Sequence, residues 1–154
     1  MKYRIYLDDV RTPIDNDWVV VRDYDEFVTK VQELGLENIE TISLDHDLGI
    51  SAMGEYHFNV SPNYTLDYNN ITEKTGYDCA KWLVNYFYNT RDKVSHTEVD
   101  GEFMNNPVEG FIFPTVYVHS ANPIGSANIL GYINNFLMNE DKPQTCVRVR
   151  IQHT

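Results

Sequence analysis

The chain has 154 residues, of which 42% are apolar, enough for one domain with a hydrophobic core. Its 12 basic and 23 acidic residues give a net charge of −11, and such a surface repels polyphosphate backbones, so general nucleic-acid binding is not expected. No apolar run reaches the ~20 residues of a membrane helix, and "MKYRIYLDD" lacks the apolar core of a signal peptide. We therefore expect a cytoplasmic protein with no membrane partner.

The first part of the chain alternates strands with a helix. "YRIYLDD" predicts a strand, Tyr3 to Leu7, that ends in an acid pair, and the loop "RTPIDND" separates it from a short strand at 18–22. A helix follows, which Asp23 can cap and Gly35 can end. The next strand runs from about Ile39 to Leu44. Because the loop 8–17 is short for a helical crossover, either the first helix is a stub or the second strand lies at an edge.

The second part continues the alternation. A helix begins near Thr75, a strand spans Thr115 to Val118, and "PIGSANILGYINNFLMN" has the apolar repeat of a helix. The alternating "TCVRVRIQ" predicts an edge strand with Arg148 and Arg150 on one side. The whole pattern predicts an α/β fold with a mainly parallel sheet.

Two long segments, about 50–74 and 91–113, interrupt this plan. Irregular segments of this length are usually functional or disordered. The first contains "YHFNV" and "YTLDY" around "SPN", a pattern that predicts a hairpin.

Polar side chains that can carry chemistry follow three predicted strands, and in open α/β sheets ligands bind beyond the carboxyl ends of the strands. These residues are Asp8 and Asp9, then Asp45, His46 and Asp47, and finally His119, Ser120 and Asn122. Crowded carboxylates repel one another unless a cation neutralises them. Oxygen ligands suit Mg²⁺ or Mn²⁺, and imidazoles widen the choice to transition metals. The pattern predicts a metal and phosphate site.

A purely structural reading also exists for each of these residues, since Asp pairs cap turns and His119 could be a buried histidine with satisfied hydrogen bonds. Their convergence at three strand ends favours a site. The remaining histidines, His57, His96 and His153, are expected at the surface, because a site needs convergent partners.

Several motifs, in order, resemble one known family. They are "YLDDVRTP", Trp18, "ISLDHDLG", "TGYDCAKWL" and "VHSANPIGSANI". Together they resemble the receiver-like domains named for predicted cyclic-phosphate processing, relatives of the response-regulator receiver domain. The resemblance covers the chain except for the two long segments. It implies a receiver/flavodoxin-like three-layer sandwich with a mainly parallel five-stranded sheet, in a single domain over residues 1–154.

The resemblance also implies roles for individual residues. Asp8 and Asp9 match the acid pair that holds Mg²⁺, and Asp45 matches the acid that accepts the phosphoryl group. Ser120 matches the hydroxyl residue after the fourth strand, and Gly76 matches the glycine that opens the third helix.

One departure from ordinary receivers bears on function. Those proteins carry a lysine just beyond the last strand, and "VRVRIQHT" has none. His46 and His119 are additions to the receiver plan. Losing the lysine and gaining two histidines favours acid–base chemistry on a phosphoester over phosphorelay, because histidine acts as an acid or base near pH 7.

We therefore predict a metal-dependent phosphoesterase that acts on, or binds, a small phosphoester such as a cyclic phosphate or nucleotide. The expected cofactor is a divalent cation, Mg or Mn. The expected metal ligands are Asp8, Asp9 and Asp45, the expected catalytic residues are Asp45, His46 and His119, and the expected phosphate contacts are Arg11, Ser120 and Asn122. Two alternatives stay open: a degenerate receiver that binds a nucleotide or protein partner without catalysis, and an Asp45 phosphoacceptor in signalling.

Overall fold

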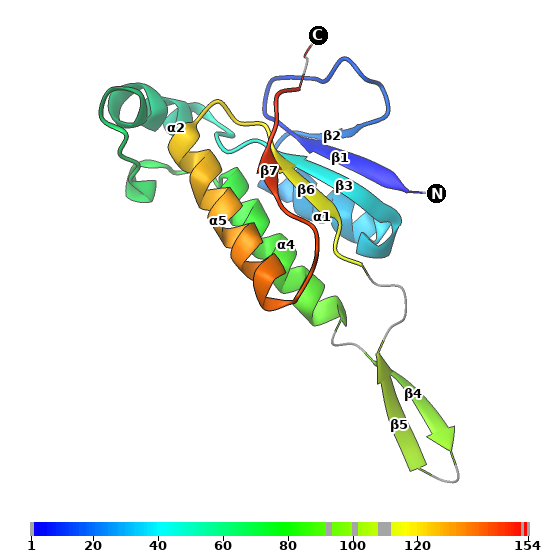
Figure 1. The fold of residues 1–154 in the computed structure, drawn as a ribbon. Helices are drawn as coiled ribbons and strands as arrows, with labels where there is room; N and C mark the ends of the chain where they lie inside the picture. Colours follow the sequence, from blue (N-terminus) through cyan, green and yellow to red (C-terminus); the bar gives the residue numbers. More distant parts are fainter. Residues whose placement is uncertain (1, 92–93, 100–101, 108–111, 152, 154) are drawn as a thin grey trace.

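A five-stranded sheet forms the centre of the molecule (Figure 1). The computed structural model describes residues 2–91, 94–99, 102–107, 112–151 and 153. The strands are all parallel and lie in the order β2-β1-β3-β6-β7. Their bounds are β1 (Tyr3–Leu7), β2 (Val19–Val21), β3 (Ile39–Leu44), β6 (Thr115–Val118) and β7 (Val147–Arg148). The receiver-like α/β class is confirmed, and β2 takes the edge position that the short preceding loop allowed.

One face of the sheet carries the apolar core. Aligned strand residues form two rows on this face: Ile5, Ile42 and Val116 in one, and Leu7, Leu44 and Val118 in the other. All six side chains are buried. The alternation of side chains along each strand sends these residues to one face and their chain neighbours to the other.

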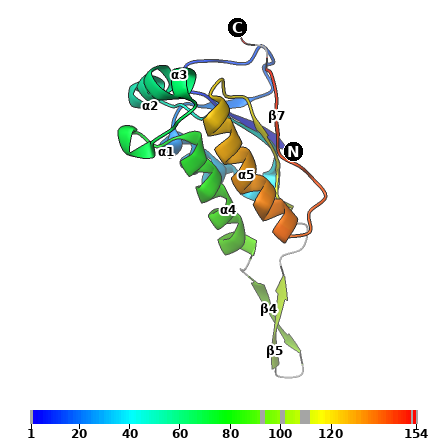
Figure 2. The same cartoon turned by 60° about the vertical axis from the view of Figure 1, so that its left-hand side comes forward.

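Three long helices cover the apolar face in a single layer (Figure 2). They are α1 (Tyr24–Leu34), α4 (Gly76–Arg91) and α5 (Pro123–Asn139), and the short η1 (Leu36–Asn38) links α1 to β3. Phe27 of α1 packs edge-on against Trp82 of α4, and Phe87 of α4 packs edge-on against Phe136 of α5. Asp23 caps α1 as expected.

The opposite face of the sheet departs from the expected three-layer sandwich. Among the described residues no helix covers it, because β1 passes to β2 through a loop too short to hold one. That loop lies over the face instead, with Trp18 edge-on to Tyr6 at 5.5 Å between ring centroids. The C-terminal segment also reaches this face, where His153 hydrogen-bonds the Tyr6 hydroxyl. Chain segments therefore replace the second helical layer.

The hairpin predicted in the first long segment is wrong, because the segment is helical. It contains α2 (Ile50–Glu55), the π-helix η2 (Tyr56–Val60), α3 (Ser61–Asn63) and η3 (Tyr68–Asn70). The buried Glu55 carboxylate explains the difference, since it accepts hydrogen bonds from the Asp67 backbone N–H at 2.7 Å and from the Asn70 amide at 3.1 Å. Through these hydrogen bonds, Glu55 at the end of α2 holds the later residues Asp67 and Asn70 against the helix. The alternating sequence pattern does not reveal such a contact.

The second long segment forms an antiparallel pair, β4 (Val94–Val99) and β5 (Glu102–Pro107), that extends away from the sheet (Figure 1). His96 belongs to β4, and its expected surface position lies outside the described side chains. Within the described part of the chain, no helix combines the length and apolar character needed to cross a membrane.

Candidate functional site

Three buried side chains meet at the carboxyl ends of the central strands. Asp8 follows β1, Asp45 follows β3 and His119 follows β6, and one ligand atom of each lies within 4.8 Å of the other two. The sheet hydrogen bonding extends into these residues, with Asp45 N–H donating to Leu7 and His119 N–H donating to Leu44, both at 3.0 Å. The ladder therefore fixes the backbone from which each side chain projects.

Asp8 is a fully buried carboxylate with several donors. Its Oδ1 accepts from the backbone N–H of Val10 at 3.1 Å and of Arg11 at 2.8 Å, and its Oδ2 lies 3.2 Å from His119 Nε2. Burial alone would raise the pKa of Asp8, but these hydrogen bonds and the Arg11 charge outweigh it and lower the pKa to about 2. Asp8 is therefore the permanent negative charge of the cluster.

Asp45 has the opposite electrostatic character. Burial and the neighbouring Asp8 charge raise its pKa to about 7, against the lowering effect of Arg11. Its Oδ1 accepts the His46 backbone N–H at 2.8 Å. Its Oδ2 makes no hydrogen bond within the part of the chain that the structure describes, so it is open to a cation or a water molecule. A carboxyl group with this pKa can exchange a proton near neutral pH.

His119 is held on both ring nitrogens. Nδ1 lies 2.7 Å from the Ser43 hydroxyl, Nε2 faces Asp8, and the ring stacks on Tyr6 with 4.1 Å between centroids. Burial lowers the pKa of His119, although the contact with Asp8 opposes this shift. The imidazole is thus predominantly neutral at pH 7, the form that can ligate a metal or accept a proton.

Arg11 is the cation nearest to the two carboxylates. Its Nε lies 2.8 Å from Asp8 Oδ2, and its Nη2 lies 3.6 Å from Asp45 Oδ1. The side chain is 35% exposed, so it can leave the acids without rearranging the core. The sequence predicted Arg11 as a phosphate contact, and the structure places it where both carboxylates and a bound anion are within its reach.

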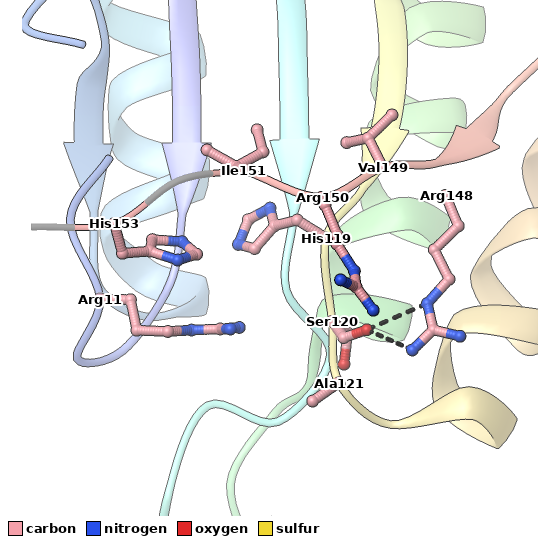
Figure 3. A pocket seen from close by; sticks show the side chains of 9 residues that line it. All are labelled: Arg11, His119, Ser120, Ala121, Arg148, Val149, Arg150, Ile151 and His153. Atoms are coloured by element: carbon pink, nitrogen blue, oxygen red, sulfur yellow. Dashed lines mark hydrogen bonds between the residues drawn. The ribbon is translucent and has the colours of Figure 1, made fainter. Parts of the chain in front are cut away.

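A basic pocket of about 590 Å³ opens beside His119 (Figure 3). Arg148, the last residue of β7, lines this pocket. Beyond β7 the chain crosses the carboxyl ends of the strands, which brings Arg150 and His153 to the same pocket. Arg148 donates from Nε and Nη2 to the Ser120 carbonyl, at 3.1 and 2.8 Å. Arg150 has no side-chain partner among the described residues, so its charge is available to an anion. Basic side chains thus gather at this pocket although the chain has a net charge of −11, and such a local positive charge suits an anion.

A second pocket, of about 280 Å³, adjoins the first. Both are lined by Arg11, Ser120 and Ala121, which form their common wall. The second pocket is lined by carboxylates together with Val10 and residues of α2 and η2. Asp9 belongs to this second pocket and not to the compact cluster; burial and the Asp8 charge raise its pKa. The carboxylate cluster thus lies where the two pockets meet.

His46 lies away from the cluster, although the sequence predicted it as catalytic. The ring is fully buried, with Nδ1 at 2.6 Å from Asp47 Oδ1 and Nε2 at 3.0 Å from the Tyr68 hydroxyl. A Cβ atom on Gly125 would lie 2.3 Å from the ring, so the imidazole fills the space under the start of α5. His46 and His119 do not face each other across the carboxylates. Its contacts give His46 a structural role, joining the first long segment to the body.

The two other expected phosphate contacts differ in availability. Ser120 lines both pockets, and its Oγ accepts the Asn122 backbone N–H at 3.1 Å, which leaves the hydroxyl proton free to donate. Asn122 caps α5 through Oδ1, and its Nδ2 donates to Asp47. Because both ends of that amide are engaged, Asn122 serves to orient the loop more than to hold a ligand.

The cluster fits a divalent cation. Two carboxylate oxygens and an imidazole nitrogen are a donor set that Mn²⁺ and other transition metals accept, and a magnesium ion prefers oxygen. Asp45 Oδ2 is open, and the remaining positions can be filled by water from the adjoining pockets. Asp8, Asp45 and His119 therefore fit the ion better than the predicted set with Asp9.

The fold and this rim define the receiver class of α/β domains, with an acid cluster at the carboxyl ends of parallel strands. A family model described as the cyclic-phosphate processing receiver domain matches residues 3–135, and the chain belongs to that family. Comparisons with curated proteins and with solved structures gave no match. Part of the lining of the basic pocket lies beyond the matched residues, namely Arg148, Arg150 and His153.

Sequence reasoning missed these three residues. The sequence pattern places Arg148 and Arg150 on one side of an edge strand, and it predicts a surface position for His153. Its half-buried ring instead contacts Tyr6, and a bridge pairs His153 with Pro13. The available signal was the position of the arginines at the end of a strand, where ligands bind in such sheets.

Proposed function

We propose that this domain hydrolyses a small phosphoester with the help of a divalent cation. The observation that supports the proposal most strongly is the junction of the basic pocket with the buried Asp8–Asp45–His119 cluster. An anion in that pocket would border His119 and Arg11, both of which contact Asp8. The pKa values of the two carboxylates in the cluster, Asp8 and Asp45, are displaced in opposite directions, an arrangement typical of acid–base sites.

Arginines would bind the phosphate. A guanidinium group presents parallel N–H donors that match two phosphate oxygens, and its charge persists at every working pH. In Figure 3 Arg11 extends toward the pocket from the left and Arg150 points down into it, with Ser120 close to the end of Arg150. The Ser120 hydroxyl can add a further donor there. Arg148 holds the Ser120 carbonyl and so orients that hydroxyl. These groups substitute for the lysine that ordinary receivers carry.

Asp8, Asp45 and His119 would hold the cation. When bound, a divalent ion at this place polarises a phosphoryl oxygen and lowers the pKa of a water molecule. The protein's own contribution is to keep the three donors rigid: hydrogen bonds to Asp8, the Tyr6 stack on His119 and the Ser43 contact leave them little freedom. Rigid donors avoid reorganisation during the reaction.

Proton transfer would fall to Asp45, the carboxylate of the cluster that lines a pocket. The oxygen of Asp45 that does not hold the cation would take a proton from water and return it to the leaving oxygen. His119 would serve as a ligand and not as a base, because its Nε2 would hold the cation and its Nδ1 faces the Ser43 hydroxyl. With the cation on Nε2, the ring proton would be on Nδ1 and would be donated to the Ser43 hydroxyl.

A screen of cyclic and linear phosphoesters tests the proposal. The protein is incubated with each compound and Mg²⁺, Mn²⁺ or Ni²⁺, and products are identified by mass and phosphate release. Hydrolysis that EDTA abolishes and Arg150→Ala weakens is the expected result. Binding without product would instead identify a non-catalytic binder, and a stable phosphoryl adduct on Asp45 would identify a phosphoacceptor.

A further inference from the structure

The pocket beside the carboxylates has an apolar wall that phosphate binding does not explain. Val10 is 74% exposed and Met53 is 45% exposed, and both line this pocket together with Tyr56. A pocket lined by apolar and aromatic side chains together with a few polar groups is typical of a site for a small molecule.

This wall is firmly built. The Glu73 carboxylate accepts hydrogen bonds from the Ser51 hydroxyl and, at 2.9 Å, from the Ala52 backbone N–H, which pins the start of α2. The Tyr68 hydroxyl ties the far end of the segment to the buried His46. Between these anchors, Tyr56 opens a π-helical turn, and such turns occur frequently at functional sites. The long segment thus presents a fixed surface to the pocket.

We propose that this pocket binds the organic group of the phosphoester, and that this group is a ring that donates hydrogen bonds and bears no negative charge, as a nucleoside does. The inference rests on the proposed function and specifies the substrate class of the same site.

The acids set the polarity of the ligand. Asp9 and Asp47 line the pocket beside Asp45, and ionised carboxylates only accept hydrogen bonds. Sugar hydroxyls and exocyclic amines can donate to them. A carboxylate on the substrate would instead meet repulsion from several like charges in a partly buried site.

The aromatic and apolar residues of the pocket favour a particular ligand shape. Tyr56 and His57 lie edge-to-face with 5.5 Å between ring centroids, and both line the pocket near Met53. Aromatic faces and a flexible thioether suit a flat ring. The volume of about 280 Å³ is large enough for one ring system.

The two pockets are connected in the order that a phosphoester needs. Arg11, Ser120 and Ala121 line both, so a phosphate held by the arginines directs its ester oxygen past Asp45 toward the apolar wall. Cleavage at that oxygen would release the organic group into the second pocket.

Titration calorimetry in Mn²⁺ tests the inference with three probes: methyl phosphate, adenosine 5′-monophosphate and phosphoglycolate. Methyl phosphate reports on the phosphate pocket alone. We expect the nucleotide to bind roughly 10-fold more tightly, within the usual effect of stacking one base on an aromatic side chain. Phosphoglycolate, which carries a carboxylate, should bind more weakly than methyl phosphate.

Variants localise the effect. Tyr56→Leu and Met53→Ala should remove most of the nucleotide's advantage and leave methyl phosphate binding unchanged. Phe58→Ala, on the same π-helix but 77% exposed and not lining the pocket, is the matched control and should change neither. Met53 is a surface side chain, so its variant folds even if Tyr56→Leu does not.

The outcomes separate the two proposals. Equal affinity for methyl phosphate and the nucleotide, or tighter binding of phosphoglycolate, overturns the inference and leaves the proposed function standing. Failure of all three probes to bind overturns both.

Discussion

His119 and Asp8 lie 111 positions apart in the chain, yet His119 Nε2 approaches Asp8 Oδ2 to 3.2 Å. Arg11 Nε bonds the same oxygen at 2.8 Å. The protein therefore balances its most buried carboxylate with a neutral imidazole and a half-exposed guanidinium. A divalent cation entering the cluster would take over the charge compensation and free Arg11 for the phosphate.

The first prediction concerns Asp45→Asn, which should abolish binding of Mn²⁺ and Mg²⁺. Asparagine keeps the oxygen that accepts the His46 N–H but loses the charge that a divalent ion needs. Isothermal titration of EDTA-treated wild type and variant measures the change. Unchanged affinity in the variant would remove Asp45 from the set of ligands.

A second prediction concerns the pH dependence of stability in the metal-free protein. Folding raises the pKa of Asp45 from 3.8 to about 7, so between these values the folded state binds the extra proton. The free energy of unfolding therefore loses up to about 1.4 kcal/mol per pH unit as pH rises through this window.

The side chain of Asp45→Asn does not titrate, so the variant avoids this loss. Its free energy of unfolding, relative to wild type, should therefore increase from pH 4 to 7 and stay constant above pH 7. Asp8 acts oppositely, because its pKa falls to about 2 on folding and its contribution is lost only as the pH drops below 3.8. Urea unfolding at several pH values measures both. A constant difference between variant and wild type from pH 4 to 8 would contradict the account of Asp45.

Third, Arg150→Ala should weaken phosphate binding by roughly 10-fold or more, since it removes a charged donor without another partner among the described residues. Arg150→Lys should recover part of the affinity, because it restores the charge but not the planar fork. Lys30→Ala on α1 removes the same charge far from the pocket and serves as control. If Lys30→Ala and Arg150→Ala lose equal phosphate affinity, the effect depends on the overall charge of the protein and not on a contact with Arg150.

The fourth prediction concerns Gly76, the first residue of α4. A Cβ atom there would lie 1.7 Å from the Asp45 backbone oxygen, so Gly76→Ala must push α4 away from the cluster. We expect a loss of about 3 kcal/mol in the free energy of unfolding, together with weaker cation binding. Gly131→Ala within α5 meets no atom within 4 Å and should be neutral or stabilising by about 1 kcal/mol. Chemical denaturation compares the two, and a tolerated Gly76→Ala would contradict the packing described.

Fifth, His119→Ala should cut single-turnover hydrolysis by roughly 10²–10⁴, the usual contribution of a group that acts in proton transfer or holds the reacting centre. Ser43→Ala, which removes only the hydroxyl at Nδ1, should lose less. Phosphate affinity should change little in Ser43→Ala, because the arginines remain. Full activity in His119→Ala would exclude this residue from the mechanism.

Local sequence patterns predict much of this arrangement. Strand alternation and caps locate β1, β3, β6 and α5, and the tendency of ligands to bind at strand ends points to Asp8, Asp45 and His119 at one rim. The same tendency does not predict which of the two histidines, His119 or His46, joins the carboxylate cluster. Which side of the rim a histidine faces depends on the turn after each strand and on space under α5, where Gly125 admits the His46 ring.

Long-range contacts explain the other differences. The helical form of residues 50–63 depends on Glu55 and its partners further along the chain, which no short window contains. The second layer of helices follows only from the analogy with ordinary receivers, and the short loop after β1 points against it. The basic pocket forms because the C-terminal segment crosses the sheet ends, a path fixed by the contacts of His153 with Tyr6 and Pro13.

The central claim is that one cation and one phosphate share the junction between the carboxylate cluster and the basic pocket. A crystal structure of the protein grown with Mn²⁺ and inorganic phosphate, with anomalous data at the manganese edge, tests it most directly. The account predicts an anomalous peak bonded to Asp8, Asp45 and His119, with phosphate against Arg150. A peak elsewhere, or no peak with Arg11 still between the two carboxylates, would contradict it.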